Sequence, residues 1–203
     1  MASGRKNDIL NAAEKCFSRF GYDKTTLDDI GKMVGINKVS LYYYFRNKEA
    51  IFTEVVNRQA DEFTGSLKKK VEKESGCREK ILTWIREGFT YSRGSSFLTQ
   101  LSMDTLKKLT PQLEELKKSS VKKGIEYFES ILAGCREKNE IIDCNINKVA
   151  STIYNVIYSI KDASYMRAKA SLGGMVDFEV MITDIVNAVS LMLDGIITGN
   201  GHN

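Results

Sequence analysis

The chain has 203 residues, of which 42% are hydrophobic and 28% are charged, and it contains a single proline. This composition argues against a disordered chain and favours a folded helical protein, long enough to bury a sizeable core in one or two domains. No run reaches the roughly 18 apolar residues of a membrane span, and no signal peptide precedes the charged start at Arg5 and Lys6. We therefore expect a cytoplasmic protein that does not bind membranes.

The cysteines and the histidine do not form a metal-binding pattern. Cys16, Cys77, Cys135 and Cys144 lack the Cys-x-x-Cys spacing, and the only histidine is His202 in a Gly/Asn-rich tail. Because a metal or redox site needs closely grouped ligands, we predict no metal and no cofactor, and we expect the thiols to be reduced and structural.

The positive charge is concentrated at the start of the chain. The formal net charge is +4, and residues 1–50 hold nine Lys and Arg against six Asp and Glu. The remaining residues hold 21 against 20, since the whole chain has 30 basic and 26 acidic residues. An excess placed in this way is what phosphate binding by the first fifty residues would require.

Three short helical patterns follow one another in the first fifty residues. The first runs from about residue 3 or 4 to Phe20, places Phe17 and Phe20 on an apolar face, and ends at Gly21. The second begins at Thr26, whose side chain can cap the amide of Asp29. Its buried face is predicted to contain Ile30, Met33 and Val34, and its left-handed end is predicted at Gly35.

The third pattern is predicted to begin after the cap Asn37 and to run from Lys38 to about Phe45. At about 100° per residue, Leu41 and Phe45 point inward while Val39, Ser40 and Tyr43 point outward. Two helices joined by a tight glycine turn, with such an outward face, are typical of a helix-turn-helix. An ordinary helical bundle, with the tyrosines in the core and at its rim, is the alternative that the pattern leaves open.

The outward face has the chemistry of a major-groove reader. A hydroxyl can bond base edges, a small apolar side chain can contact a thymine methyl, and phenols and ammonium groups can bond phosphate oxygens. Asn47 caps the next helix, so Lys48 stands at a helix start that favours phosphate. The predicted DNA-binding residues are Thr26, Lys38, Val39, Ser40, Tyr42, Tyr43, Tyr44 and Lys48.

These residues resemble the DNA-binding domain of the tetracycline-repressor (TetR) family of bacterial regulators. The family pattern T-x-x-x-I-A-x-x-A-G-V-S-x-x-x-x-Y-x-H-F-x-x-K is matched over about the first fifty residues. The positions in register are Thr26, Ile30, Gly35, Tyr42, Phe45 and Lys48. The resemblance implies that Lys38, Val39, Ser40 and Tyr43 contact bases or the groove, and that Thr26, Tyr42, Tyr44 and Lys48 hold the DNA backbone. Departures from the pattern include Val39 in place of a frequent glycine, which leaves open which bases are read.

The resemblance and the helical patterns together predict an all-α fold. Residues 1–47 are expected to form the helix-turn-helix domain, and residues 48–203 a helical ligand-binding and dimerisation domain. A long helix is predicted from Asn47 to about Glu74, followed by helices over 79–91 and 97–109. Thr110 as N-cap and Pro111 at the first helical position predict the start of the next long helix.

A small-molecule pocket is expected among the helices of the second domain. Aromatic and methionine side chains suit a mostly apolar site with a few phenol hydroxyls, although core packing remains open for each of them. The candidate lining residues are Trp84, Phe89, Phe97, Met103, Tyr127, Phe128, Tyr154, Tyr158 and Met166.

The last two helical patterns favour a dimer interface. The helix over 146–167 has two nonpolar faces, and a second apolar helix follows the Gly173-Gly174 loop. TetR-like proteins dimerise through their last two long helices, so a four-helix arrangement of two copies is expected, with ordinary intradomain packing as the alternative. The predicted interface residues are Ile153, Ile157, Ile160, Ile182, Ile185, Val189, Met192 and Ile196.

The expected function is that of a homodimeric transcriptional regulator. We expect a repressor that binds a near-palindromic operator in double-stranded DNA and that a small, largely apolar effector releases. A helical enzyme is disfavoured, because no phosphate loop or metal-ligand cluster is visible and the only histidine lies in the tail. A DNA binder without an effector remains as a third hypothesis.

Overall fold

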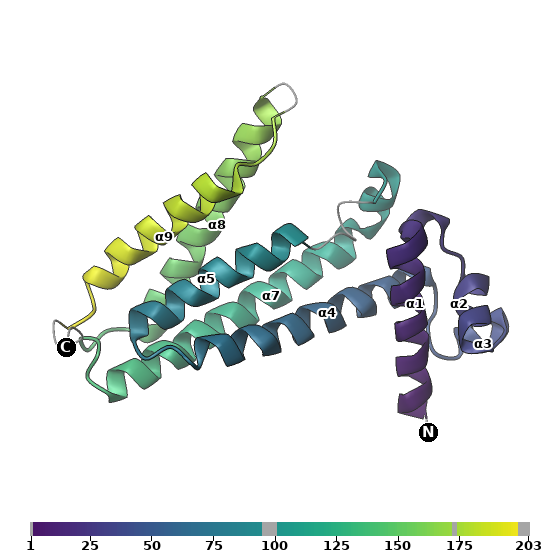
Figure 1. Cartoon of the computed structure of the whole chain (residues 1–203), viewed down its shortest axis with the longest axis horizontal. Helices are drawn as coiled ribbons and strands as arrows, with labels where there is room; N and C mark the ends of the chain where they lie inside the picture. Colours follow the sequence, from purple (N-terminus) through teal and green to yellow (C-terminus); the bar gives the residue numbers. More distant parts are fainter. Residues whose placement is uncertain (1, 95–100, 172–173, 199–203) are drawn as a thin grey trace. The chain divides into compact units, whose positions relative to one another are not determined.

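The structure, a computed structural model, describes residues 2–94, 101–171 and 174–198. Within these ranges the predicted all-α fold is confirmed, and the only β-type pairing is a single antiparallel bridge between Ile141 and Ile197. None of the described helices is both long and apolar enough to cross a membrane. The helices drawn in Figure 1 are α1 (Ala2–Lys24), α2 (Leu27–Val34), α3 (Lys38–Tyr42), α4 (Lys48–Val71), α5 (Cys77–Gly94), α7 (Met103–Glu137), α8 (Ile146–Ala170) and α9 (Phe178–Asp194).

The chain packs as two compact units. The N-terminal unit comprises residues 1–64 and 94–117, and the C-terminal unit comprises residues 65–93 and 118–203. Helices α4 and α7 each contribute residues to both units. The domain boundary that we predicted between residues 47 and 48 was drawn by expected function and does not coincide with the division into packing units, and it stays a prediction.

The core of the N-terminal unit forms around α1. Phe17 is fully buried, and its ring centroid lies 5.5 Å from those of Tyr22 and Phe52. Phe20, which we predicted in this core, is instead 46% exposed. After Gly21, whose φ of 77° and ψ of 161° end the helical geometry, Tyr22 turns back into the core, and its ring packs against those of Phe17 and Phe52.

The predicted caps of α2 are confirmed. The Thr26 hydroxyl accepts a hydrogen bond from the Asp29 amide, the Asp29 carboxylate accepts one from the Thr26 amide, and Gly35 ends the helix at φ 72°. Ile30 is buried as predicted, but Met33 is 48% exposed. Helix α2 ends one residue after Met33, and its core contacts are made by Ile30 and by the half-buried Val34.

The capping residue of α3 is also confirmed, but this helix is shorter than we predicted. The Asn37 side chain accepts a hydrogen bond from the Ser40 amide at 2.8 Å, and the helix ends at Tyr42 rather than near Phe45. Leu41 and Phe45 are both buried, so the inward anchor is present even though the last part of the segment is a turn.

One predicted helix start is wrong. Thr110 and Pro111 lie inside α7, which runs without interruption from Met103 to Glu137. The Thr110 hydroxyl donates to the Leu106 carbonyl at 2.8 Å instead of capping a new helix. The proline costs the helix one backbone N–H, and the packing of the long helix outweighs that local penalty. Of the helix predicted over 97–109, residues 97–100 lie outside the described residues, residues 101–102 are not helical, and residues 103–109 belong to the start of α7.

The start of α7 is tied to the end of α1 within the N-terminal unit. Asp23 accepts a hydrogen bond from the Ser102 amide at 3.1 Å and another from the Thr105 hydroxyl. Leu101 and Leu109 are buried in the same core as α1. The Thr105 hydroxyl is the main reason why the pKa of Asp23 is held below its usual value.

The C-terminal unit contains α5, the second part of α7, and the antiparallel pair α8 and α9 (Figure 1). Asn145 caps α8 and Asp177 caps α9. After α9 the chain pairs with the segment before α8, since the Ile142 amide donates to the Ile196 carbonyl at 2.8 Å. Arg78 at the start of α5 forms an ion pair with Asp194 at the end of α9.

Candidate nucleic-acid interface

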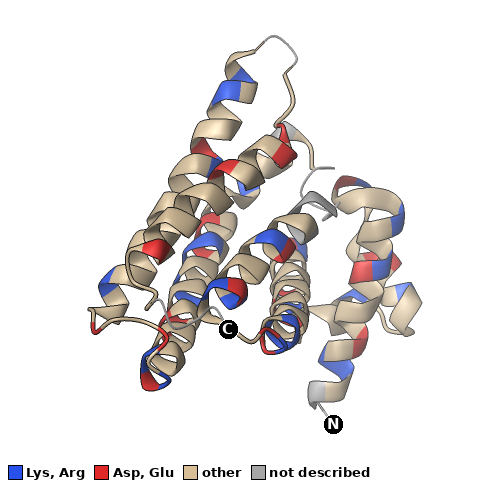
Figure 2. Ribbon diagram, turned by 60° about the vertical axis from the view of Figure 1, so that its left-hand side comes forward, with Lys and Arg blue, Asp and Glu red and all other residues tan. Residues whose placement is uncertain are grey.

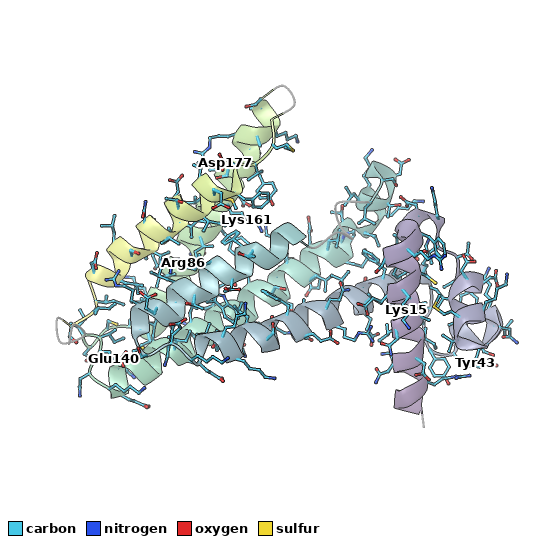
Figure 3. All side chains as sticks on the ribbon, viewed as in Figure 1. Lys15, Tyr43, Arg86, Glu140, Lys161 and Asp177 are labelled. Carbon is cyan, nitrogen blue, oxygen red and sulfur yellow. The ribbon has the colours of Figure 1, made fainter. Side chains whose placement is uncertain are left out.

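The outward face of α3 is exposed as we predicted. Tyr43 is 85% exposed, Val39 is 67% exposed and Tyr42 is 50% exposed, while Leu41 between them is buried. Tyr43 is labelled beside α3 in Figure 3. Large apolar and aromatic side chains held in solvent by a buried anchor form a surface suited to a partner.

The polar residues around this face differ in their accessibility. Lys38 is exposed and Ser40 is half-buried, with the amide of Ser40 held by the Asn37 cap. Thr26 is exposed at the start of α2, where its hydroxyl donates to Asp29 at 2.6 Å. Tyr44 is half-buried and packs against the core of the N-terminal unit, so only part of this side chain is accessible.

Lys48 lies at the start of α4 as we predicted, but its ammonium group points into the unit. The Nζ atom donates to the carbonyls of Tyr22 and Thr25, both at 2.9 Å, and lies 4.2 Å from the centroid of the Tyr22 ring. Burial lowers the pKa of this ammonium, and the charge of Glu49 opposes that effect. In this structure Lys48 holds the end of α1 against α4, and its predicted phosphate contact stays a prediction.

Sequence reasoning missed Arg46, which is exposed. It directly follows residues 38–45, which we call the recognition segment. Within the described part of the chain, neither Arg46 nor Lys38 forms an ion pair. By contrast, basic and acidic residues are interspersed along α1 (Figure 2), where Lys6 forms an ion pair with Glu54 at 2.5 Å. The signal that could have identified Arg46 is a cation directly after the segment that was predicted to read DNA.

The structure brings five of the nine predicted pocket residues together in the C-terminal unit. The centroid of the Trp84 ring lies 4.4 Å from that of Tyr127, Phe128 lies 5.4 Å from Tyr154, and Tyr154 stacks on Tyr158 at 5.4 Å. Trp84 is also hydrogen-bonded to Tyr154, and burial raises the pKa values of Tyr154 and Tyr158. We call Trp84, Tyr127, Phe128, Tyr154 and Tyr158 the aromatic cluster.

The structure describes the side chains of two of the other four predicted pocket residues. Met166 is 68% exposed on α8, and Phe89 is half-buried on α5. Phe97 and the side chain of Met103 lie outside what the structure describes. A groove of about 210 Å³ lies beside the cluster and is lined by Tyr127 together with Val71, Ile131, Glu72, Lys80 and Lys138 among others.

Half of the predicted dimer residues lie in the interior of a single chain. Ile153, Ile157, Ile185 and Val189 are buried within the C-terminal unit, which corrects their assignment to a subunit interface. The sequence pattern could not separate the two roles, because an apolar stripe that packs α8 on α9 looks the same as one that packs on a second copy. The predicted residues that remain half-buried are Ile160, Ile182, Met192 and Ile196.

The described residues contain no group of three or more His, Cys, Asp or Glu side chains arranged to hold a metal ion.

Comparisons with known proteins support the prediction of a helix-turn-helix in the N-terminal unit. Residues 9–55 match the family model described as bacterial regulatory proteins, tetR family. An uncharacterised helix-turn-helix-type transcriptional regulator of Bacillus subtilis, YhgD, is 38% identical over 82 residues, which are 40% of this chain and 39% of that protein. The negative transcriptional regulator IcaR of the biofilm operon icaADBC in Staphylococcus epidermidis is 53% identical over 51 residues, 25% of this chain and 28% of that protein. These relatives are regulators, which agrees with the sequence argument against an enzyme.

Solved structures extend the likeness of fold over nearly the whole chain. A transcriptional regulator from Cytophaga hutchinsonii has a TM-score of 0.73 at 22% identity, over 94% of this chain and 97% of that one. SmeT, a repressor from Stenotrophomonas maltophilia, in complex with triclosan has a TM-score of 0.61 at 16% identity, over 97% and 93% of the two chains. The sequence matches span less than half of the length of these curated relatives. Residues 9–55, which include the helix-turn-helix, are thus similar to the tetR family of bacterial regulatory proteins.

Proposed function

We propose that this protein is a homodimeric transcriptional repressor that binds a near-palindromic operator and leaves it when a small, largely apolar effector binds. The observation that carries the DNA-binding part is the exposed side of α3, where Val39 and Tyr43 stand in solvent beside the buried Leu41. An apolar face of this kind is costly to leave in water unless a partner covers it. The match to tetR regulators indicates that the partner is duplex DNA.

The side chains of the recognition segment divide into two roles under this proposal. Val39, Ser40 and Tyr43 enter the major groove and contact base edges, while Lys38 and Tyr42 bond phosphates on the two sides of the groove. The exposed N-terminus of α2, capped by Thr26, adds amide dipoles toward a phosphate. Tyr44 packs against the core beneath the recognition segment, and only the exposed part of its side chain can contact the DNA backbone.

Lys48 is assigned a double role. Its two carbonyl partners leave one of its three N–H groups for a phosphate, and its main contribution is to hold the ends of α1 and α4 together. Replacing Lys48 with Met would then weaken binding to all duplexes alike and also lower the stability of the N-terminal unit. A lysine that acted only as a phosphate ligand would leave stability unchanged when replaced.

A dimer follows from the geometry of helix-turn-helix recognition, because two half-sites about 34 Å apart require two recognition helices related by a two-fold axis. The surface proposed for the second copy is the solvent side of α8 and α9. It includes Leu191, which is 73% exposed, and Val180, which is 53% exposed, next to the half-buried Ile182 and Met192. Two such helix pairs would form a four-helix contact.

The aromatic cluster is the proposed effector site. It offers ring faces and the phenols of Tyr154 and Tyr158, which suit an apolar ligand with one or two polar groups. The complex of the structurally similar SmeT with triclosan, an aromatic phenol, supports this class of ligand. Since Trp84 is the only tryptophan, its fluorescence reports directly on ligand binding at the cluster.

The DNA-binding part of the proposal is tested with a randomised duplex pool. The full-length protein is used to select bound duplexes at low salt, and the selected sequences are examined for two-fold symmetry. We expect a symmetric consensus, a shifted preference for Ser40→Ala, and an unshifted preference with weaker binding for Tyr42→Phe. Selection of no duplex, or of sequences without two-fold symmetry, would refute the dimeric operator model.

The effector part is tested separately, by titrating small phenols and fatty acyl compounds while following Trp84 fluorescence and operator binding. We expect some of them to change the emission and to weaken operator binding together. A ligand that saturates the fluorescence change while operator affinity stays constant would remove the regulatory part of the proposal and leave the DNA-binding part intact.

A further inference from the structure

Two of the four cysteines lie side by side in the C-terminal unit. Cys77 is the first residue of α5, and Cys135 lies in the last turn of α7. Their side chains are hydrogen-bonded to each other, and both are buried. The other two cysteines lie elsewhere, Cys16 in the core of the N-terminal unit and Cys144 before α8.

Glu140 fixes the backbone of both members of this pair. Its carboxylate accepts a hydrogen bond from the Cys77 amide at 3.0 Å, and its own amide donates to the Cys135 carbonyl at 2.9 Å. Figure 3 labels Glu140 at the end of the C-terminal unit where α5 begins and α7 ends. One residue thus holds the two thiols in register, which reduces the rearrangement needed to join them.

A groove gives a small molecule access to one member of the buried pair. This groove of about 210 Å³ beside the aromatic cluster is lined by Cys135 and Glu140 together with Lys80 and Lys138, and Cys77 adjoins it through its hydrogen bond to Cys135. This volume is several times the share of about 30 Å³ that a water molecule occupies in the liquid, so a molecule as small as hydrogen peroxide can enter.

The surroundings favour a thiolate at one of the two positions. Cys77 stands at a helix N-terminus, where the dipole favours negative charge. The hydrogen bond from Cys135 holds the pKa of Cys77 below its usual value, helped by Lys80 and Arg78 and opposed by burial and by Glu140. The same hydrogen bond and burial raise the pKa of Cys135, which therefore keeps its proton. Cys77 is therefore the thiol of the pair that ionises first, which suits an attacking cysteine, and Cys135 suits a resolving one.

We propose that Cys77 and Cys135 form a modification site for hydroperoxides, at which oxidation joins the start of α5 to the end of α7 through a disulfide. In the first step the Cys77 sulfur attacks one peroxide oxygen and the O–O bond breaks. Cys77 becomes a sulfenic acid, and the departing hydroxide takes a proton to form water. In the second step the Cys135 sulfur attacks the sulfenic sulfur, the S–O bond breaks and a second water leaves. Overall, two thiols lose two electrons and two protons to one peroxide.

This site uses no residue of the proposed DNA-binding surface, because all of its residues belong to the C-terminal unit. It lies next to the proposed effector site, since Tyr127 of the aromatic cluster lines the same groove as Cys135.

The proposal is tested on the reduced full-length protein with hydrogen peroxide as the probe. After treatment, catalase removes the peroxide, and the remaining thiols are alkylated in denaturant before peptide mass spectrometry. We expect two of the four thiols to escape alkylation. The peptides containing Cys77 and Cys135 should be linked to each other until a dithiol reductant is added.

Variants separate the roles of the two cysteines. Cys77→Ser should slow peroxide consumption by about tenfold or more, because burial still raises the pKa of the Cys135 thiol. Cys135→Ser should let Cys77 accumulate as a sulfenic acid that dimedone traps. Cys144→Ser is the matched control and should leave the yield of the Cys77 and Cys135 link unchanged.

Three results would overturn the proposal, and the first two are read from the wild-type protein alone. One is that all four thiols survive peroxide that oxidises glutathione under the same conditions. Another is that Cys77 passes to the sulfinic acid without a link to Cys135. The third is a disulfide that depends on Cys144 and disappears in Cys144→Ser.

Discussion

Truncating two residues of α3 that are two positions apart should change the stability of the protein by very different amounts. Leu41 is 1% exposed and Val39 is 67% exposed. Leu41→Ala removes three buried carbon groups, at about 0.8 kcal/mol each, and leaves a cavity, so we expect a loss of about 3–4 kcal/mol in the free energy of unfolding. Val39→Ala removes atoms that are already in water, and its effect should stay within about 0.5 kcal/mol.

The two variants are compared by urea and thermal unfolding followed by far-UV circular dichroism. For a cooperative chain of this length, the loss at Leu41 corresponds to a decrease in Tm of about 6–16 °C. Duplex binding is then measured by fluorescence anisotropy at a temperature where both variants are folded. Val39→Ala should change which duplex is preferred while its Tm matches the wild type.

The opposite pattern would refute the placement of the α3 faces. If Val39→Ala destabilised the protein by several kcal/mol while Leu41→Ala unfolded like the wild type, Val39 would lie inside and the proposed DNA-binding surface would be wrong. Equal stability of both variants would mean that α3 is not anchored by Leu41.

Two further variants test contacts away from the DNA surface. In Gly124→Ala the added Cβ would lie 1.9 Å from the Tyr154 hydroxyl, and we expect its overpacking cost of about 1–3 kcal/mol to exceed the gain of about 1 kcal/mol from removing a helical glycine. A lower Tm and altered Trp84 fluorescence check this, and an unchanged spectrum would show that Tyr154 does not pack there. In Thr105→Val the pKa of Asp23, which is lowered chiefly by the Thr105 hydroxyl, should rise toward its ordinary value, as NMR titration of the carboxyl would detect. Because the pKa of Asp23 is lowered in the folded state, its carboxylate stabilises the fold at pH values above its unfolded pKa. That stabilisation is lost as the pH falls through the folded-state pKa. The loss of unfolding free energy on acidification should therefore be smaller in Thr105→Val than in the wild type.

Local signals predicted most of the N-terminal unit. The caps at Thr26 and Asn37, the left-handed Gly35 and the inward pair Leu41 and Phe45 all depend on neighbours within a few residues, and the structure confirms each of them. Where such local rules failed, tertiary packing decided. Phe20 is exposed, and Tyr22 beyond the break at Gly21 is buried in the core.

Contacts between distant parts of the chain could not be predicted. The sequence contains no sign that Lys48 donates to the carbonyls of Tyr22 and Thr25, because those bonds depend on how α1 ends against α4. The proximity of Cys77 to Cys135 was equally hidden, since it arises from the packing of α5 against α7.

An apolar stripe likewise does not identify what it packs against. Ile153 and Ile185 fit the pattern of an interface between subunits, yet they lie inside one chain. Proline is similarly ambiguous as a signal. It is frequent at the first position of a helix, but Pro111 lies within α7.

The central claim is that the outward side of α3 docks on duplex DNA, and the affinity of wild type and Tyr43→Ala for a selected duplex at low salt tests it most directly. Tyr43 is 85% exposed, so its removal should leave Tm unchanged. We predict that the wild type binds with an affinity that falls steeply as salt is added, and that Tyr43→Ala binds about tenfold or more weakly, a loss of about 1.4 kcal/mol. A wild-type protein that binds no duplex at low salt, or a Tyr43→Ala variant that binds as tightly as the wild type, would contradict it.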